Sequence, residues 1–122
     1  MSRRNQSFGK RGEEAAAACA QQQGYELLET NSRTPFGEID VILRSPEGEI
    51  VFMEVKTRSG TAYGDPEEAV SPAKLSHMER SAEFWLEAHY EKTPPCRMDV
   101  MAIRYTADKG SISEMKWYKD VG

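Results

Sequence analysis

Apolar and polar positions along the chain predict two helices and five strands. Residues 13–23 contain only Ala, Glu and Gln apart from one cysteine, which predicts a helix, and Gly24 supplies its C-terminal stop. A second helix is expected from Ser71-Pro72, an N-cap followed by proline at the first helical position, and it ends before Pro94. Its buried stripe is expected at spacings of three and four residues: Leu75, Met78, Ala82, Trp85 and His89.

Strands are predicted over 25–30, 38–44, 49–58, 97–105 and 112–118. Asn31-Ser32 and Pro35 are expected to end the first strand, and residues 45–48 form the turn between the next two. Residues 57–70 contain two glycines and a proline without a periodic pattern, which is typical of a functional or disordered loop. The element order αβββαββ predicts an α/β fold with a mixed β-sheet flanked by helices.

Alternation along the two central strands predicts which side chains share a face. Ile50, Phe52, Glu54 and Lys56 form one face of strand 49–58, whereas Glu38, Asp40, Ile42 and Arg44 are opposed to Ile39, Val41 and Leu43 in strand 38–44. We expect the antiparallel register that sets Asp40 opposite Glu54 and Ile42 opposite Phe52. A slip by one residue would place the Asp40 carboxylate on the apolar face.

This register brings two carboxylates and an ammonium group together at the end of an apolar surface. Asp40 and Glu54 would repel each other unless one is protonated or a cation lies between them. Mg²⁺ favours carboxylate oxygens, and Lys56 could position a water or stabilise charge on a phosphate. The alternative is an ordinary solvated face on which Lys56 pairs with Glu38. Glu38 is further out on that face, and the sequence leaves Asp99 open, either as an anchor for a turn or as part of the site.

Composition limits the remaining possibilities. The chain of 122 residues fits one domain, and no apolar run is long enough to cross a bilayer. Cys19 and Cys96, without metal-site spacing, indicate reduced and buried thiols, so a cytoplasmic protein is expected. The net charge of −4 argues against tight non-specific DNA binding, although residues 1–10 and Arg11 form a cationic start that is either a DNA-binding arm or a disordered terminus.

The chain also resembles a known group of proteins. Asp40 followed by Glu54-Val55-Lys56, after a helix carrying Glu13, resembles the PD-(D/E)XK nuclease superfamily, which includes restriction enzymes and archaeal Holliday-junction resolvases. More closely, it resembles the small bacterial YraN family of predicted endonuclease-like proteins. The matching segments are Gly12-Glu13, Gly24-Tyr25, Gly37-Glu38-Ile39-Asp40, Glu54-Val55-Lys56-Thr57-Arg58, Glu68-Ala69-Val70 with Lys74, and Arg97-Met98-Asp99-Val100. One departure from the superfamily pattern is that Ile39, not proline, precedes Asp40.

The resemblance implies a restriction-endonuclease-like fold and a role for each matching residue. Asp40, Glu54 and the Val55 carbonyl would bind Mg²⁺ or Mn²⁺, Lys56 would be the catalytic lysine, and Glu13 would reach the site from the first helix. Arg11, Arg58 and Lys74, with Arg3, Arg4 and Lys10, are expected to contact phosphates.

Two functions remain open at this point. One is a metal-dependent endonuclease that hydrolyses DNA phosphodiester bonds, on branched or damaged DNA. The other is a non-catalytic module of the same fold that binds nucleic acid or protein. Cutting both strands of a junction needs two sites related by a two-fold axis, which favours a homodimer.

Overall fold

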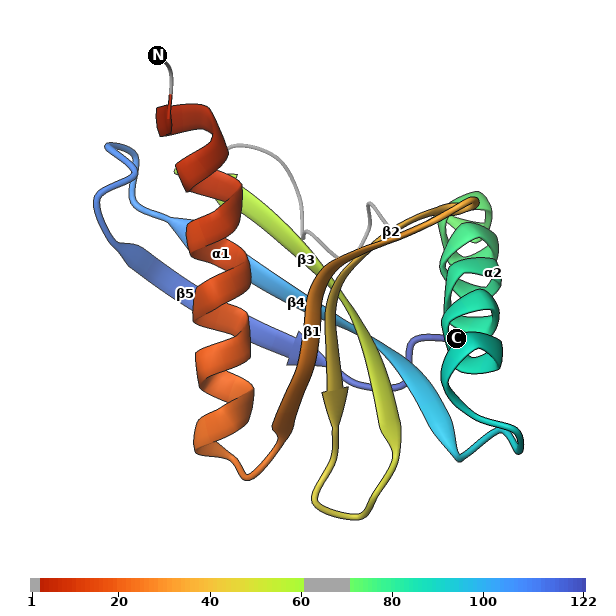
Figure 1. The fold of residues 1–122 in the computed structure, drawn as a ribbon. Coiled ribbons are helices and arrows are strands. Elements are labelled where there is room, and N and C mark those ends of the chain that lie inside the picture. The colour runs from red at the N-terminus through yellow and green to blue at the C-terminus, as the bar shows by residue number, and fades with distance from the viewer. Residues whose placement is uncertain (1–2, 61–70) are drawn as a thin grey trace.

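The computed structural model describes residues 3–60 and 71–122, with side chains from Gly9 onward in the first helix. It forms one five-stranded sheet, in the order β1-β2-β3-β4-β5, with a helix on each face (Figure 1). The elements are α1 (Arg3–Gln22), β1 (Glu26–Thr34), β2 (Gly37–Arg44), β3 (Ile50–Ser59), α2 (Pro72–His89), β4 (Cys96–Tyr105) and β5 (Ile112–Tyr118). The predicted α/β class and the order αβββαββ are confirmed.

The sheet is mixed because α2 carries the chain across it. The pairs β1–β2, β2–β3 and β4–β5 are antiparallel, whereas β3 and β4 are parallel and are joined through α2. A parallel connection needs a crossover of this kind. β3 is therefore a central strand, and its first five residues are all buried.

Alternating residues of the central strands form two separate cores. Val41, Leu43, Val51 and Met53 pack beneath the small residues of α1, which is why the helix is rich in alanine. Ile42, Ile50 and Phe52 pack against Ala82, Trp85 and Leu86 of α2. The predicted faces of β3 are thus correct, and each helix covers one of them.

The structure corrects four local expectations. α1 begins at Arg3 rather than Glu13, so residues 3–10, where a disordered arm was one of the two alternatives, continue the helix. β1 continues through Asn31 to Thr34, because Asn31 adopts a left-handed φ of 51° and the pairing resumes at Ser32. β3 extends to Ser59, and the rest of the expected loop, with Glu68, lies outside the described residues. Cys96 is exposed rather than buried.

The buried stripe of α2 also differs from the predicted one. Ser81, Ala82, Trp85 and Leu86 are its buried residues, so the sheet-facing side is rotated toward Leu86. His89 is exposed, although its ring stacks on Trp85 with 3.9 Å between centroids. The apolar spacing alone did not distinguish Leu86 from His89, because both follow Ala82 by about one or two turns.

Asp99 is a structural anchor on β4. It is fully buried and accepts hydrogen bonds from Arg97 Nε, from Trp117 Nε1 at 2.8 Å and from the Asp120 backbone N–H at 2.9 Å. Arg97 also donates to the Tyr25 hydroxyl at 2.8 Å. This network ties the end of the chain to β4 and to the start of β1, so the question left open for Asp99 is answered in favour of the anchor.

Neither helix in the described part of the chain is long and apolar enough to span a membrane.

Candidate functional site

The candidate site lies where β2 and β3 part. Their antiparallel pairing sets Ile42 opposite Phe52, as expected, and ends at Val41 opposite Met53, one pair short of the expected pair of Asp40 with Glu54. Beyond that pair the β1–β2 ribbon bends toward α2, while β3 continues on the side of α1 (Figure 1). Asp40 lies in this fork, and its Oδ2 accepts the Val55 backbone N–H at 2.8 Å.

The bend also changes the parity of β2. Ile39 was expected to share a face with Val41, which packs on the α1 side, but it is buried in the α2-side cluster with Ile42. A strand that leaves its partner and twists no longer alternates about a single plane. Asp40 is therefore held inside the fork rather than on a flat sheet face.

The environment of Asp40 disfavours its ionised form. Burial, the nearby Glu54 carboxylate and Glu13 raise the pKa of Asp40 from an ordinary value of 3.8 to about 7, although the Val55 N–H and Lys74 act in the opposite direction. A carboxyl group of this kind accumulates negative charge only at a cost, and a cation would relieve that cost. The electrostatic conflict inferred from the sequence is present in the fold.

Glu54 is buried and contacts two ammonium groups. Its Oε2 lies 3.3 Å from Lys56 Nζ and 3.3 Å from Lys74 Nζ. Lys56 reaches it from two residues along β3, and Lys74 reaches it from the first turn of α2, where the Ser71 hydroxyl caps the helix by accepting the Lys74 N–H. The alternative pairing of Lys56 with Glu38 is not what the structure shows. Glu38 is exposed and pairs with Arg33 at 3.6 Å instead.

Glu13 is brought toward the site from α1, as the resemblance implied. Its Oε1 accepts a hydrogen bond from Asn31 Nδ2 at 2.8 Å, and its charge contributes to the raised pKa of Asp40. Asn31 lies across the β1–β2 ribbon from Asp40, between Thr30 opposite Val41 and Ser32 opposite Ile39. Sequence reasoning missed Asn31, because an Asn-Ser pair is more often a strand break than a continued strand.

Gly12 allows α1 to approach β3 closely. A Cβ at this position would lie 2.7 Å from Thr57 Cγ2 and 3.7 Å from Val55 Cγ1. A larger residue would force Thr57 or the helix to shift, so Gly12 allows the short distance between the helix carrying Glu13 and the strand carrying Glu54. The sequence analysis used the Gly12-Glu13 pair only as part of the family resemblance and assigned no packing role to Gly12.

Three of the six predicted phosphate contacts, Arg11, Arg58 and Lys74, lie in different surroundings. Arg11 Nη1 donates to the Lys109 carbonyl at 3.2 Å and its guanidinium lies over the Tyr105 ring, so it is directed to the β4–β5 turn. Arg58 is partly buried, and its Nη1 donates to the backbone carbonyl of the preceding residue, Thr57, at 2.9 Å. Lys74 is at the site but paired with Glu54.

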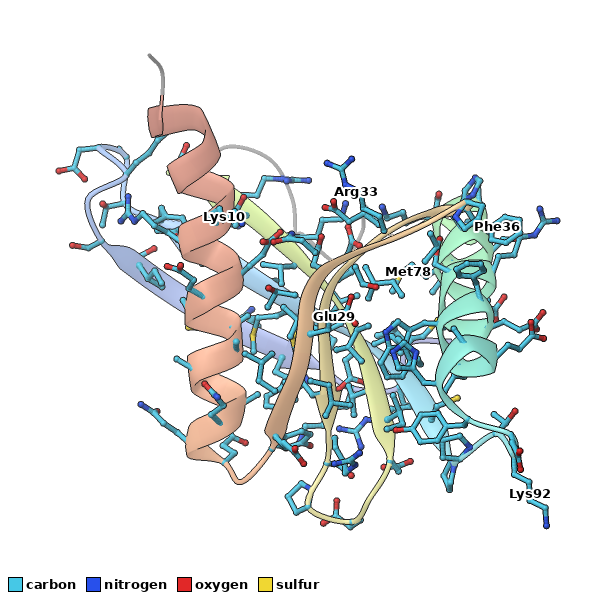
Figure 2. The ribbon with its side chains drawn as sticks, in the orientation of Figure 1. Lys10, Glu29, Arg33, Phe36, Met78 and Lys92 are labelled. Atoms are coloured by element: carbon cyan, nitrogen blue, oxygen red, sulfur yellow. The ribbon has the colours of Figure 1, made fainter. Side chains whose placement is uncertain are left out.

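A chain of polar contacts forms one rim of the site. Lys10 Nζ lies 3.4 Å from Asn31 Oδ1, and Asn31 Nδ2 lies 3.5 Å from Glu38 Oε1, which places side chains of α1, β1 and β2 next to one another. Figure 2 shows Lys10 and Arg33 toward the same end of the molecule, away from Lys92. The rim therefore presents both charges to solvent.

The donor atoms of the fork fit a hard divalent cation. Asp40 and Glu54 supply carboxylate oxygens, and the Val55 carbonyl leaves β3 on the same edge as the N–H that Asp40 accepts. Since the β2–β3 ladder ends at Val41 and Met53, that carbonyl faces the fork. Within residues 9–60 and 71–122 no three His, Cys, Asp or Glu side chains are grouped as a metal site. The candidate ligands at the fork are therefore two carboxylates and one backbone carbonyl.

The residues of the fork lie within the segment of the chain that matches a known protein family. The chain matches the family described as "Uncharacterised protein family UPF0102" over residues 12–103. A UPF0102 protein of Desulforamulus reducens is 38% identical and the match covers 98% of both chains, and one of Pelobacter propionicus is 43% identical over 81% of this chain and 71% of its own. A comparison of folds matches this chain to one in a solved structure, "Structure of EndoMS-dsDNA2 complex", at 19% sequence identity. The match covers 70% of this chain and 32% of the solved one, and its TM-score of 0.36 supports no conclusion.

Proposed function

The chain belongs to the uncharacterised protein family UPF0102, and for this member we propose a divalent-metal-dependent endonuclease that hydrolyses phosphodiester bonds of DNA, with branched or damaged DNA as substrate. The observation that supports the proposal most directly is the fork. Asp40, whose pKa is raised to about 7, lies there beside buried Glu54, and Lys56 contacts the same glutamate. A buried glutamate beside a partly buried aspartate with a perturbed pKa, with a lysine adjacent, is typical of a catalytic site.

Mg²⁺ or Mn²⁺ is the cofactor we propose for this site. Asp40, Glu54 and the Val55 carbonyl would hold the cation, which removes the repulsion between the two carboxylates. When bound, it supplies positive charge that polarises a phosphoryl oxygen.

The protein's own groups then position the reactants. The Lys56 ammonium, held against Glu54 on a central strand, orients the attacking water and stabilises the negative charge that develops on the phosphate. The water oxygen attacks phosphorus in line, the bond to the leaving sugar oxygen breaks, and the proton lost by water is balanced by one gained at that oxygen. Asn31 holds Glu13 at the edge of the fork, where its carboxylate adds to the negative field.

DNA contacts would come from cations around the fork rather than from base-reading groups. Arg58 and Lys74 lie on the elements that form the site, and Lys10 lies on its rim. Arg11 would contribute only by leaving the β4–β5 turn. Such contacts position the phosphate backbone without reading the base sequence. This agrees with a branched or damaged DNA substrate, which is recognised by its shape rather than by its sequence.

A non-catalytic binding module is the competing proposal. The net charge of −4 favours it because it weakens the case for tight binding to DNA. The two lysines already paired with Glu54 favour it because they weaken the case for a cation at the fork. The two proposals differ in one property: the endonuclease must bind a divalent cation, whereas the module need not.

The decisive experiment combines cation binding with cleavage. Calorimetric titration of Mn²⁺ into the wild type should give a saturable isotherm that Glu54→Gln abolishes, with exposed Glu114→Gln as the control. Duplex, nicked, flapped and four-way DNA should be cleaved with Mg²⁺ or Mn²⁺ by the wild type and not by Asp40→Ala or Lys56→Ala. Unchanged cleavage in either variant would refute this site, and absence of cation binding in the wild type would favour the binding module. Light scattering with and without four-way DNA tests the homodimer.

A further inference from the structure

Two ammonium groups contact one oxygen of a buried carboxylate. Lys56 Nζ and Lys74 Nζ are each 3.3 Å from Glu54 Oε2, and the Glu54 side chain is only 9% exposed. One carboxylate needs only one ammonium for neutrality, and two like charges on one oxygen repel each other. The Asp40 carboxylate, whose ionised form Lys74 favours, offsets part of this excess positive charge.

The two lysines are held differently. Lys56 belongs to a central strand, and its side chain is 21% exposed. Lys74 belongs to the first turn of α2, at the edge of the fork, and its side chain is 38% exposed. Because a more exposed ammonium recovers its hydration more readily, Lys74 is the one that leaves Glu54 at lower cost.

A divalent cation at Asp40 and Glu54 would have to share Glu54 with these ammonium groups. The added double charge repels both, and relief comes from moving the more exposed one. A lysine has a flexible four-carbon stem, so the Lys74 ammonium can turn to the mouth of the fork without moving α2. There it would meet the phosphate backbone of a bound nucleic acid.

We propose that Lys74 is a displaceable counter-ion: it neutralises Glu54 in the metal-free protein, is released when a divalent cation binds, and then pairs with a phosphate of the nucleic acid. This rests on the proposed function, because it assumes that a cation binds at the fork. Cation binding and nucleic-acid binding are then coupled, and the coupling is reciprocal. The metal-free protein would hold DNA weakly through this residue.

The first test measures cation affinity without nucleic acid. Mn²⁺ is titrated calorimetrically into the wild type, Lys74→Met, Lys74→Arg and Lys92→Met. Lys74→Met should bind Mn²⁺ about tenfold more tightly, since one competing positive charge is gone. Lys74→Arg keeps the charge and should stay near the wild type. Lys92 is exposed beyond the end of α2 (Figure 2), so Lys92→Met should change nothing.

The second test measures DNA binding by fluorescence anisotropy, with a labelled duplex and Ca²⁺ in place of Mg²⁺. Lys74→Met should bind more weakly than the wild type, and its salt dependence should be shallower by about one counterion. A third measurement needs no variant. Amine acylation followed by mass spectrometry should show Lys74 becoming more reactive when Mn²⁺ is added, with Lys92 unchanged.

The outcomes separate this inference from the proposed function. If the wild type binds Mn²⁺ but Lys74→Met binds it no more tightly, or if Mn²⁺ leaves the reactivity of Lys74 unchanged, the displacement is refuted and the endonuclease proposal stands. If neither protein binds Mn²⁺, the endonuclease proposal fails, and the displacement fails with it.

Discussion

Replacing Asp40 by asparagine should stabilise the metal-free protein at neutral and alkaline pH. The substitution keeps an oxygen that can accept the Val55 N–H, which Asp40 Oδ2 now accepts at 2.8 Å. It removes a charge that burial, Glu54 and Glu13 oppose. A residue at the centre of a catalytic site would therefore lower the stability of its own fold, as strained functional groups do.

The size of the effect follows from linkage between protonation and folding. Because the folded-state pKa of about 7 exceeds the ordinary value of 3.8, the folded protein binds the extra proton between these limits. The stability that this proton contributes is complete below about pH 4 and is lost as the pH rises through about 7. At about 1.4 kcal/mol for each pKa unit, the full loss in free energy of unfolding is about 4 kcal/mol. Because Asp40 is only partly buried, we expect to measure a difference of about 2–4 kcal/mol between the variant and the wild type.

The assay is urea unfolding followed by tryptophan fluorescence, for the wild type and Asp40→Asn, from about pH 4 to about pH 9. The difference in free energy of unfolding should be below about 1 kcal/mol at the acid end, grow with pH, and level off above about pH 8. Glu47→Gln, on the exposed β2–β3 turn, is the matched control and should show no such trend. Saturating Mn²⁺ should stabilise the wild type and not Asp40→Asn.

A difference that is independent of pH would refute this reasoning. So would a variant that is less stable than the wild type at about pH 8. Either result would mean that Asp40 is not held against its charge in the folded protein, and the main electrostatic support for the cation site would be lost.

Three further predictions concern residues that shape the fold around the site. Gly12→Ala should cost about 1–3 kcal/mol of stability, because its Cβ would meet Thr57 Cγ2 at 2.7 Å, and adding Thr57→Ser should restore most of that stability. The control is Gly9→Ala, which has nothing within 4 Å and should instead stabilise the helix by about 0.5–1 kcal/mol. Equal effects of the two alanine substitutions on the free energy of unfolding would contradict a close approach at Gly12. Asp99→Asn should lower the free energy of unfolding by about 3–5 kcal/mol while leaving Mn²⁺ affinity unchanged in calorimetry, and a loss below about 1 kcal/mol would show that the buried network is not an anchor. Asn31→Ala should cost about 1–3 kcal/mol in thermal unfolding, and Asn31→Gly should recover the share due to the left-handed backbone; no difference between the two would argue against backbone strain.

Much of the fold follows from local patterns in the sequence. The order of elements, the start of α2 at Ser71-Pro72 and the bounds of β5 were predicted correctly, because capping and alternation depend on neighbouring residues. The part of the β2–β3 register that includes Ile42 opposite Phe52 was predicted as well, since a slip by one residue would set polar side chains against the apolar face. The predicted pair of Asp40 with Glu54 would be the next in this register, but the ladder ends one pair before it.

Only the tertiary structure decided how the site is completed. The parting of β2 from β3, which turns Ile39 to the α2 side and encloses Asp40, depends on packing between segments far apart in the chain. The same is true of Lys74, which reaches Glu54 from α2, and of Arg11, which turns to the β4–β5 turn. Periodicity and propensity describe one segment at a time. The pKa of Asp40 is raised by burial, by Glu54 of β3 and by Glu13 of α1, and is lowered by Lys74 of α2, so no single stretch of sequence contains its environment.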